Sequence, residues 1–121
     1  MSEPSDTNPN SIDRNDVRVV IDAGIATVVE ALPASYYDDA HLPGARNLPH
    51  DSDEATIGAV LPDRDATVVV YCSSLACQNS TMLSRRLAQL GYTDVRDYES
   101  GKEDWITAGL PTESCVPANR R

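Results

Sequence analysis

The sequence has no phenylalanine, one tryptophan, one lysine and no long apolar run. A membrane-spanning helix needs about 20 mostly apolar residues, so none is predicted. The first ten residues lack the basic and apolar regions of a secretory signal, and a cytoplasmic location is therefore expected. With 121 residues, 40% of them hydrophobic, the chain has room for a single domain with a modest core.

Basic residues and cysteines are also scarce. Ten basic residues stand against 19 acidic ones, which gives a formal net charge of −9. Such a surface repels phosphate backbones and anionic lipids, so neither nucleic acids nor membranes are expected as partners. The three cysteines, Cys72, Cys77 and Cys115, cannot all be paired within one chain. In a cytoplasmic protein they indicate reactivity or burial rather than structural disulfides.

Apolar periodicity and turn residues predict helices and strands in alternation. Helices are expected from Ser11 to a stop at Gly24 (where a strand is also compatible), over 34–38, over 53–60 with a cap at Ser52, over 80–90 and over 103–108. Strands are expected over 27–32, 66–72 and 95–98, with a short extended segment within 41–49. This alternation predicts an α/β fold with a parallel sheet between helices. Residues 1–11 are expected to form a disordered leader and 114–121 a tail, which leaves a domain over 12–113.

Cys72 is the leading candidate for chemistry. It ends the predicted buried strand, and open α/β sheets bind ligands where strands end and strand-to-helix loops meet. The helix that follows offers free amides and a positive dipole end, so the Cys72 thiol is expected to have a lowered pKa and to be nucleophilic. The loop residues expected around it, with small side chains that cap the helix start, are Ser73, Ser74, Leu75, Ala76, Cys77, Gln78, Asn79 and Ser80. A cysteine in this place can also be a plain core residue.

Several short signatures follow one another along the chain. The first half contains Tyr36-Tyr37, His41-Leu-Pro-Gly-Ala45 and Asn47-Leu-Pro49, and the second contains Tyr71-Cys72, Leu90-Gly-Tyr92 and the stretch from Val95 to Pro111. In this order they resemble the rhodanese-like domain family over nearly the whole chain. The resemblance implies a single rhodanese-like domain of the α/β class, with a mostly parallel five-stranded sheet and helices on both faces.

The same resemblance implies a sulfurtransferase or persulfide carrier. Domains of this family hold sulfane sulfur as a persulfide on the loop cysteine, and Cys72 matches that cysteine. Cys72 would take sulfur from thiosulfate, from a small persulfide or from a sulfur-relay protein, and would give it to a thiol or to cyanide. The amides of residues 73–80 would hold the charge of the persulfide. Neither a metal ion nor an organic cofactor is implied.

The loop departs from the common family pattern. Leu75 and Asn79 stand near the places of the usual glycine and arginine, and the loop is longer. Without the arginine, backbone amides would have to hold an anionic donor, which predicts weak binding of thiosulfate. The acidic residue and arginine usual at the end of the first long strand are also altered, to Glu30-Ala-Leu32. A longer loop also resembles phosphatases and arsenate reductases of the same fold, but these depend on a loop arginine.

Cys77 lies five positions after Cys72 on the same loop, so the two sulfur atoms can come within bonding distance. Two interpretations stay open. Cys77 is either a second thiol that resolves a persulfide or carries sulfur itself, or a small residue that fills the loop. A thiol redox protein that uses both cysteines is therefore an alternative function. A non-catalytic binding module is another, because the loop arginine is missing.

The remaining candidates have structural explanations. His41 is expected to fix its turn by bonding to the backbone, and Trp105 to pack in the core. Arg85 and Arg86 lie more than one turn into the helix after the site and are expected to face solvent rather than bind an anion. Cys115, in the predicted tail, is expected to take no part.

Overall fold

The computed structural model describes residues 10–114 of the chain. The strands are β1 (Thr27–Glu30), β2 (Arg46–Asn47), β3 (Thr67–Tyr71) and β4 (Asp94–Tyr98). The helices are α1 (Arg14–Ala23), α2 (Ala34–Asp39), α3 (Glu54–Val60), α4 (Asn79–Gln89) and α5 (Gly101–Thr107). The strands form one sheet in the order β2-β1-β3-β4, and every neighbouring pair is parallel. The predicted α/β class with a parallel sheet is confirmed.

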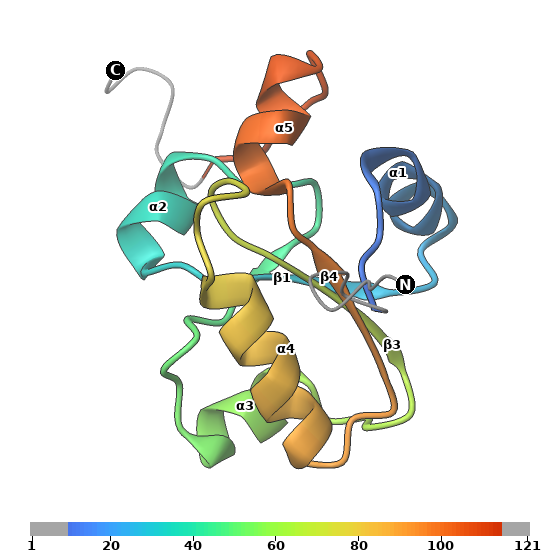
Figure 1. Ribbon diagram of the computed structural model, residues 1–121, viewed down its shortest axis with the longest axis vertical. Coiled ribbons are helices and arrows are strands. Elements are labelled where there is room, and N and C mark those ends of the chain that lie inside the picture. The colour runs from blue at the N-terminus through green and yellow to red at the C-terminus, as the bar shows by residue number, and fades with distance from the viewer. Residues whose placement is uncertain (1–9, 115–121) are drawn as a thin grey trace, which may run out of the picture.

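Two apolar clusters cover the two faces of the sheet. Because side chains alternate along a strand, Val68 and Val70 of β3 point to one face, and Val69 and Tyr71 point to the other. Figure 1 shows α3 and α4 together on one side of the sheet and α1 and α5 on the other. Strand β3 is therefore buried on both faces, as its continuous apolar run predicts.

The helix ends follow local sequence signals, with two corrections. The prediction that the first helix starts at Ser11 is wrong, because Asp13 caps α1, which begins at Arg14. Helix α1 ends at Gly24, which has the left-handed φ of 65° that glycine adopts without strain. Helix α3 begins after Asp53, whose carboxylate accepts a hydrogen bond from the Thr56 amide at 2.8 Å. The prediction of Ser52 as that cap is wrong, because the Ser52 hydroxyl donates to the Pro49 carbonyl at 2.7 Å instead.

The sheet has four strands among the described residues, so the prediction of five is wrong. A trace of a fifth strand is present beside β4, where Ser11 forms a single parallel bridge with Asp97. The Ile12 amide donates to the Asp97 carbonyl, and the Asp97 amide donates to the carbonyl of Asn10. Because Asp13 caps α1 immediately afterwards, this segment turns into a helix and cannot continue as a strand. Residues 1–9 of the predicted leader lie outside the described residues.

Within residues 10–114, none of the helices has the length and apolar character that crossing a membrane requires.

Candidate functional site

Cys72 directly follows β3, the strand between β1 and β4, at the carboxyl edge of the sheet. The loop after it runs to α4 and passes close to the start of α5 (Figure 1). Two amides of α5 hold its first residues: Lys102 N–H donates to the Cys72 carbonyl at 2.8 Å, and Glu103 N–H to the Ser73 carbonyl at 2.7 Å. Gly101 allows this close approach, because a Cβ atom there would lie 2.6 Å from the Cys72 carbonyl oxygen. These two bonds and the close contact with Gly101 hold the backbone of Cys72 and Ser73 against the start of α5.

The first turn of α4 directs its free amides at sulfur atoms. The residue before the helix, Gln78, makes no side-chain capping bond in the described structure, so the prediction of a side-chain cap here is wrong. The backbone amide of Asn79 lowers the pKa of Cys77, and that of Ser80 lowers the pKa of Cys72. Amides at a helix start lack partners within the helix, so here the two thiols serve as their acceptors.

The Cys72 thiol is buried, with the whole residue 0% exposed. Its sulfur atom lies 3.2 Å from the carbonyl oxygen of Cys77 and 3.6 Å from the Ser80 hydroxyl oxygen. Burial raises the pKa of Cys72, and the hydrogen bond with the Cys77 thiol raises it further, whereas the Ser80 amide and hydroxyl lower it. The net shift is upward, so the prediction of a lowered pKa for Cys72 is wrong: loss of hydration outweighs one helix amide.

Cys77 has the lowered pKa of the pair. Its own partial burial raises the pKa, but hydrogen bonds from the Cys72 thiol, from the Asn79 and Ser73 amides and from the Ser73 hydroxyl together lower it. The loop therefore surrounds the sulfur of Cys77 with more donors than the sulfur of Cys72. A single negative charge shared by the two thiols is more stable on Cys77, which is half-buried rather than fully buried.

Cys77 also lines an open cleft of about 250 Å³. Its other lining residues are Leu75, Gln78, Thr81, Met82, Arg85 and Glu99. Arg85 is exposed, as predicted, yet it belongs to this cleft. A second cleft, of about 390 Å³, is lined by Ser73, Ser74, Lys102, Glu103, Ile106 and Thr107. Cationic, anionic and apolar side chains thus surround Cys77, whereas Cys72 lines neither cleft.

The other predicted loop residues fall into two groups. Ser73, Ser74 and Asn79 are partly buried and bond within the loop, where the Ser74 carbonyl accepts from the Cys77 amide at 3.0 Å. Leu75, Ala76 and Gln78 are exposed. Ser80, the first buried residue of α4, places its hydroxyl oxygen 3.6 Å from the Cys72 sulfur. Of the eight predicted loop residues, Cys77 is itself one of the two thiols, and three of the other seven face outward.

A buried ion pair beneath the loop was not predicted from the sequence. The ammonium of Lys102 lies 3.0 and 3.1 Å from the two oxygens of the Glu30 carboxylate, which also accepts from the Tyr71 hydroxyl at 2.7 Å. The same ammonium donates to the Tyr36 and Ala40 carbonyls at 3.0 and 2.6 Å. The signal in the sequence was the single lysine, which follows the glycine at the start of α5. This network ties α5, and through it the Cys72 carbonyl, to β1 and α2.

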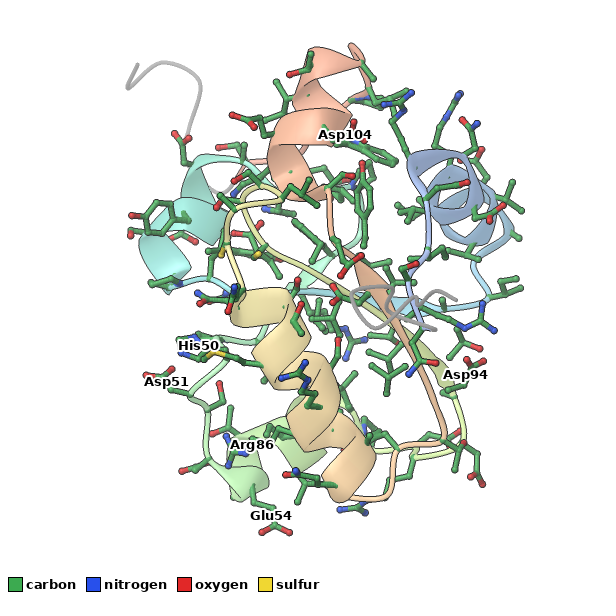
Figure 2. The ribbon with its side chains drawn as sticks, in the orientation of Figure 1. His50, Asp51, Glu54, Arg86, Asp94 and Asp104 are labelled. Carbon is green, nitrogen blue, oxygen red and sulfur yellow. The ribbon has the colours of Figure 1, made fainter. Side chains whose placement is uncertain are left out.

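Four other residues were assigned roles from the sequence, namely His41, Trp105, Arg86 and Cys115. His41 stacks on Tyr37 at 3.9 Å between ring centroids, and its Nδ1 lies 2.8 Å from the Tyr37 carbonyl oxygen, so its structural role is confirmed. Trp105 is buried in the core, as predicted. Arg86 is half-buried rather than fully solvent-facing, because it donates to the Ser52 carbonyl in the segment before α3 (Figure 2). Cys115 lies outside the described residues.

Among the described residues, 10–114, no three histidine, cysteine or acidic side chains come close enough together to hold a metal ion. The chemistry available to the site is that of the two thiols, the amides around them and the charged side chains of the adjacent clefts.

Comparison with known proteins connects this arrangement to a family. The sequence profile of the rhodanese-like domain matches residues 10–108. The chain is 30% identical over 96 residues to the HTH-type transcriptional regulator Rv0324 of Mycobacterium tuberculosis, and 34% identical over 61 residues to the thiosulfate sulfurtransferase PspE of Escherichia coli. These alignments cover 79% and 50% of this chain. They span only 41% and 57% of the two relatives.

Solved structures show the same fold. The BH2092 protein of Bacillus halodurans superposes with a TM-score of 0.79 at 25% identity, covering 87% of this chain and 77% of its own. A thiosulfate sulfurtransferase from Pseudomonas aeruginosa superposes with a TM-score of 0.77 at 27% identity, over 88% of this chain and 20% of its own. The fold is therefore shared both with small proteins and with one part of a much larger one.

Proposed function

Because the chain belongs to the rhodanese-like domain family, we propose that it is a sulfurtransferase or persulfide carrier that stores sulfane sulfur on Cys72 and passes it to a thiol or cyanide acceptor. The observation that supports this most directly is the position of Cys72. It stands at the carboxyl end of a central parallel strand, and its sulfur lies within a loop that supplies a helix amide and a hydroxyl from Ser80. The similarity to PspE and to the Pseudomonas sulfurtransferase favours the same activity class.

The surroundings of Cys72 suit storage more than rapid attack. The raised pKa keeps Cys72 protonated near neutral pH, and a thiol is a poor nucleophile compared with a thiolate. Loading must therefore include loss of the thiol proton, for which Cys77 is the neighbouring acceptor. Once sulfur is attached, burial of Cys72 slows the reaction of the persulfide with thiols in solution. The Ser80 amide and hydroxyl then stabilise its negative charge.

Mass spectrometry tests this proposal. After incubation with a sulfane-sulfur donor and removal of excess reagent with a mild thiol wash, the protein is expected to retain one additional sulfur atom. Fragmentation of the tryptic loop peptide is expected to place that sulfur on Cys72, and cyanide is expected to remove it as thiocyanate. Cys72→Ser should retain no lasting adduct. If neither thiosulfate nor a small persulfide ever leaves sulfur on Cys72, the proposal is wrong.

A thiol redox function is a second candidate, favoured by the hydrogen bond between the Cys72 and Cys77 thiols. A peroxide would oxidise one thiol to a sulfenic acid with release of water, and the other thiol would displace a second water to form the disulfide. Peptide mapping without reductant decides this question. A Cys72–Cys77 cross-link formed by about one equivalent of peroxide would support the redox function, and its consistent absence would exclude it.

A further inference from the structure

The route by which a donor reaches Cys72 is not direct. Cys72 is completely buried and is absent from the lining of the three described clefts that the loop borders. Cys77 is half-buried, forms part of the wall of the cleft of about 250 Å³, and lies beside Cys72, whose sulfur atom is 3.2 Å from the Cys77 carbonyl oxygen. A small molecule that enters this cleft therefore meets Cys77 before it can meet Cys72.

The charges of the cleft restrict which donors fit it. Arg85 supplies a cation and Glu99 an anion, while Leu75 and Met82 add apolar surface, being 72% and 45% exposed. A carboxylate, an ammonium and a short apolar stem complement this set, and an amino acid carries all three. Thiosulfate has two negative charges and no cation, so Glu99 and the net charge of −9 both oppose its binding.

We propose that this cleft binds a zwitterionic amino-acid persulfide, and that Cys77 takes its sulfane sulfur and hands it to Cys72. The donor carboxylate bonds to Arg85, its ammonium to Glu99, and its stem lies against Met82. The inference rests on the proposed function, since it names the donor class and the route of sulfur for the same site.

The transfer balances without an oxidant or reductant. The Cys77 thiolate attacks the outer sulfur of the donor R–S–SH, the bond between the two donor sulfurs breaks, and R–S⁻ leaves while Cys77 becomes a persulfide, Cys77–S–SH. The sulfur of Cys72 then attacks the outer sulfur of Cys77–S–SH. As the bond to Cys77 breaks, the proton of the Cys72 thiol passes to the released Cys77 sulfur along the hydrogen bond that joins them. The products are Cys72–S–SH and the Cys77 thiol.

The electrostatics of the loop agree with this order. The amides of Ser73 and Asn79 and the Cys72 thiol lower the pKa of Cys77 in spite of its partial burial, whereas burial raises the pKa of Cys72. The thiol nearer to solvent is thus the one more readily ionised, and it is the one required to react first. The more deeply buried thiol receives sulfur from inside the protein.

The first experiment follows sulfur by rapid quenching with iodoacetamide and peptide fragmentation. With L-cysteine persulfide as donor, the adduct is expected on Cys77 first and on Cys72 later. Cys77→Ser, which nearly preserves side-chain size, should slow loading of Cys72 by about tenfold or more. Cys72→Ser should still form a short-lived adduct on Cys77, even though it retains none after a thiol wash. Urea unfolding of each variant verifies that its fold is intact.

The second experiment tests the charges with two donors, L-cysteine persulfide and 3-mercaptopropionate persulfide, which lacks the ammonium. Glu99→Gln should slow loading from L-cysteine persulfide by about threefold, which is the size of effect expected for a partly exposed ion pair. The same variant should leave the rate of loading from 3-mercaptopropionate persulfide unchanged or increase it. Arg85→Gln should slow both donors. Arg18→Gln is the matched control, since Arg18 is exposed on α1 and its loss changes the net charge equally; it should change neither rate.

The outcomes separate this inference from the proposed function. If the wild-type protein carries sulfur on Cys72 but Cys77→Ser loads at the wild-type rate, the route through Cys77 is refuted and storage on Cys72 stands. If Glu99→Gln affects both donors equally, the zwitterion specificity is refuted. If the wild-type protein takes sulfur from neither persulfide on either cysteine, the inference is refuted, and the proposed function fails with it only if thiosulfate also leaves no sulfur on Cys72.

Discussion

Gly101 provides a quantitative test of how α5 holds the loop. Replacement of Gly101 by alanine is expected to destabilise the protein more than replacement of Gly109 by alanine. Both glycines have a positive φ, 71° and 79°, so an L-residue costs a similar amount of about 1–2 kcal/mol at each. At Gly109 a Cβ atom meets nothing within 4 Å in the described structure, whereas at Gly101 it would lie 2.6 Å from the Cys72 carbonyl oxygen. The difference between the two variants isolates the contact.

The expected difference in the free energy of unfolding between the two variants follows from the hydrogen bonds that Gly101→Ala breaks. To make room for the Cβ atom, the backbone of Cys72 and Ser73 must move away from α5, which breaks the bonds from Lys102 N–H (2.8 Å) and Glu103 N–H (2.7 Å). At about 1 kcal/mol each, their loss amounts to about 2 kcal/mol. Gly101→Ala should therefore lose about 3–4 kcal/mol in all, which a domain stable by about 5–15 kcal/mol can survive.

Urea unfolding provides the assay, with the fluorescence of the single tryptophan as the signal. Trp105 is 2% exposed in the core, so its emission reports loss of packing. The two variants should differ in unfolding midpoint at a similar m-value, since a changed m-value would indicate altered states rather than altered stability. If Gly101→Ala and Gly109→Ala lose the same free energy within about 0.5 kcal/mol, the two bonds do not contribute as reasoned.

Three further predictions concern the ion pair and the thiols. Lys102→Met should reduce the free energy of unfolding by about 3–5 kcal/mol, because it leaves the Glu30 carboxylate buried without its cation. Urea unfolding should show that adding Glu30→Gln recovers much of this loss. A double variant no more stable than Lys102→Met would contradict the prediction. Alkylation by iodoacetamide from about pH 6 to about pH 10, read out by peptide mapping, should show that Cys77 becomes reactive at lower pH than Cys72. The reason is that the pKa of Cys77 is lowered and the pKa of Cys72 is raised. The reverse order would refute the assignment of the negative charge to Cys77. Ser80→Ala should shift the alkylation midpoint of Cys72 to still higher pH, because the Ser80 hydroxyl lowers that pKa, and an unchanged midpoint would show that this hydroxyl does not bond to the thiolate.

The fold was predictable where local signals act alone. The unbroken apolar run of β3 and the glycine after α1 each determine an element from a few neighbouring residues, and both predictions are confirmed. The number of strands depends on how far the segment before α1 runs beside β4. The paired segment ends where Asp13 starts α1, because a residue in that helix cannot also pair with β4, a strand far away in the sequence.

The candidate site was predictable in its place but not in its charge. The order strand, cysteine, loop and helix located Cys72 and the residues around it. Which of two nearby thiols the amides reach depends on how the loop folds back, and the sequence contains no periodic signal for that. Burial also acts against ionisation, so a helix start beside Cys72 did not suffice to lower its pKa. The pairing of Lys102 with Glu30 joins residues 72 positions apart, beyond the reach of any local pattern.

The firm anchorage of the loop at both of its ends has a consequence for protein engineering. Its first residues are bonded to α5, and its last belong to the first turn of α4, whereas Leu75 and Ala76 project outward. Lengthening a chain segment of this kind costs little entropy when its termini stay fixed. Residues 75 and 76 are therefore where inserted or randomised sequence is expected to be tolerated, with the anchoring bonds at both ends of the loop left intact.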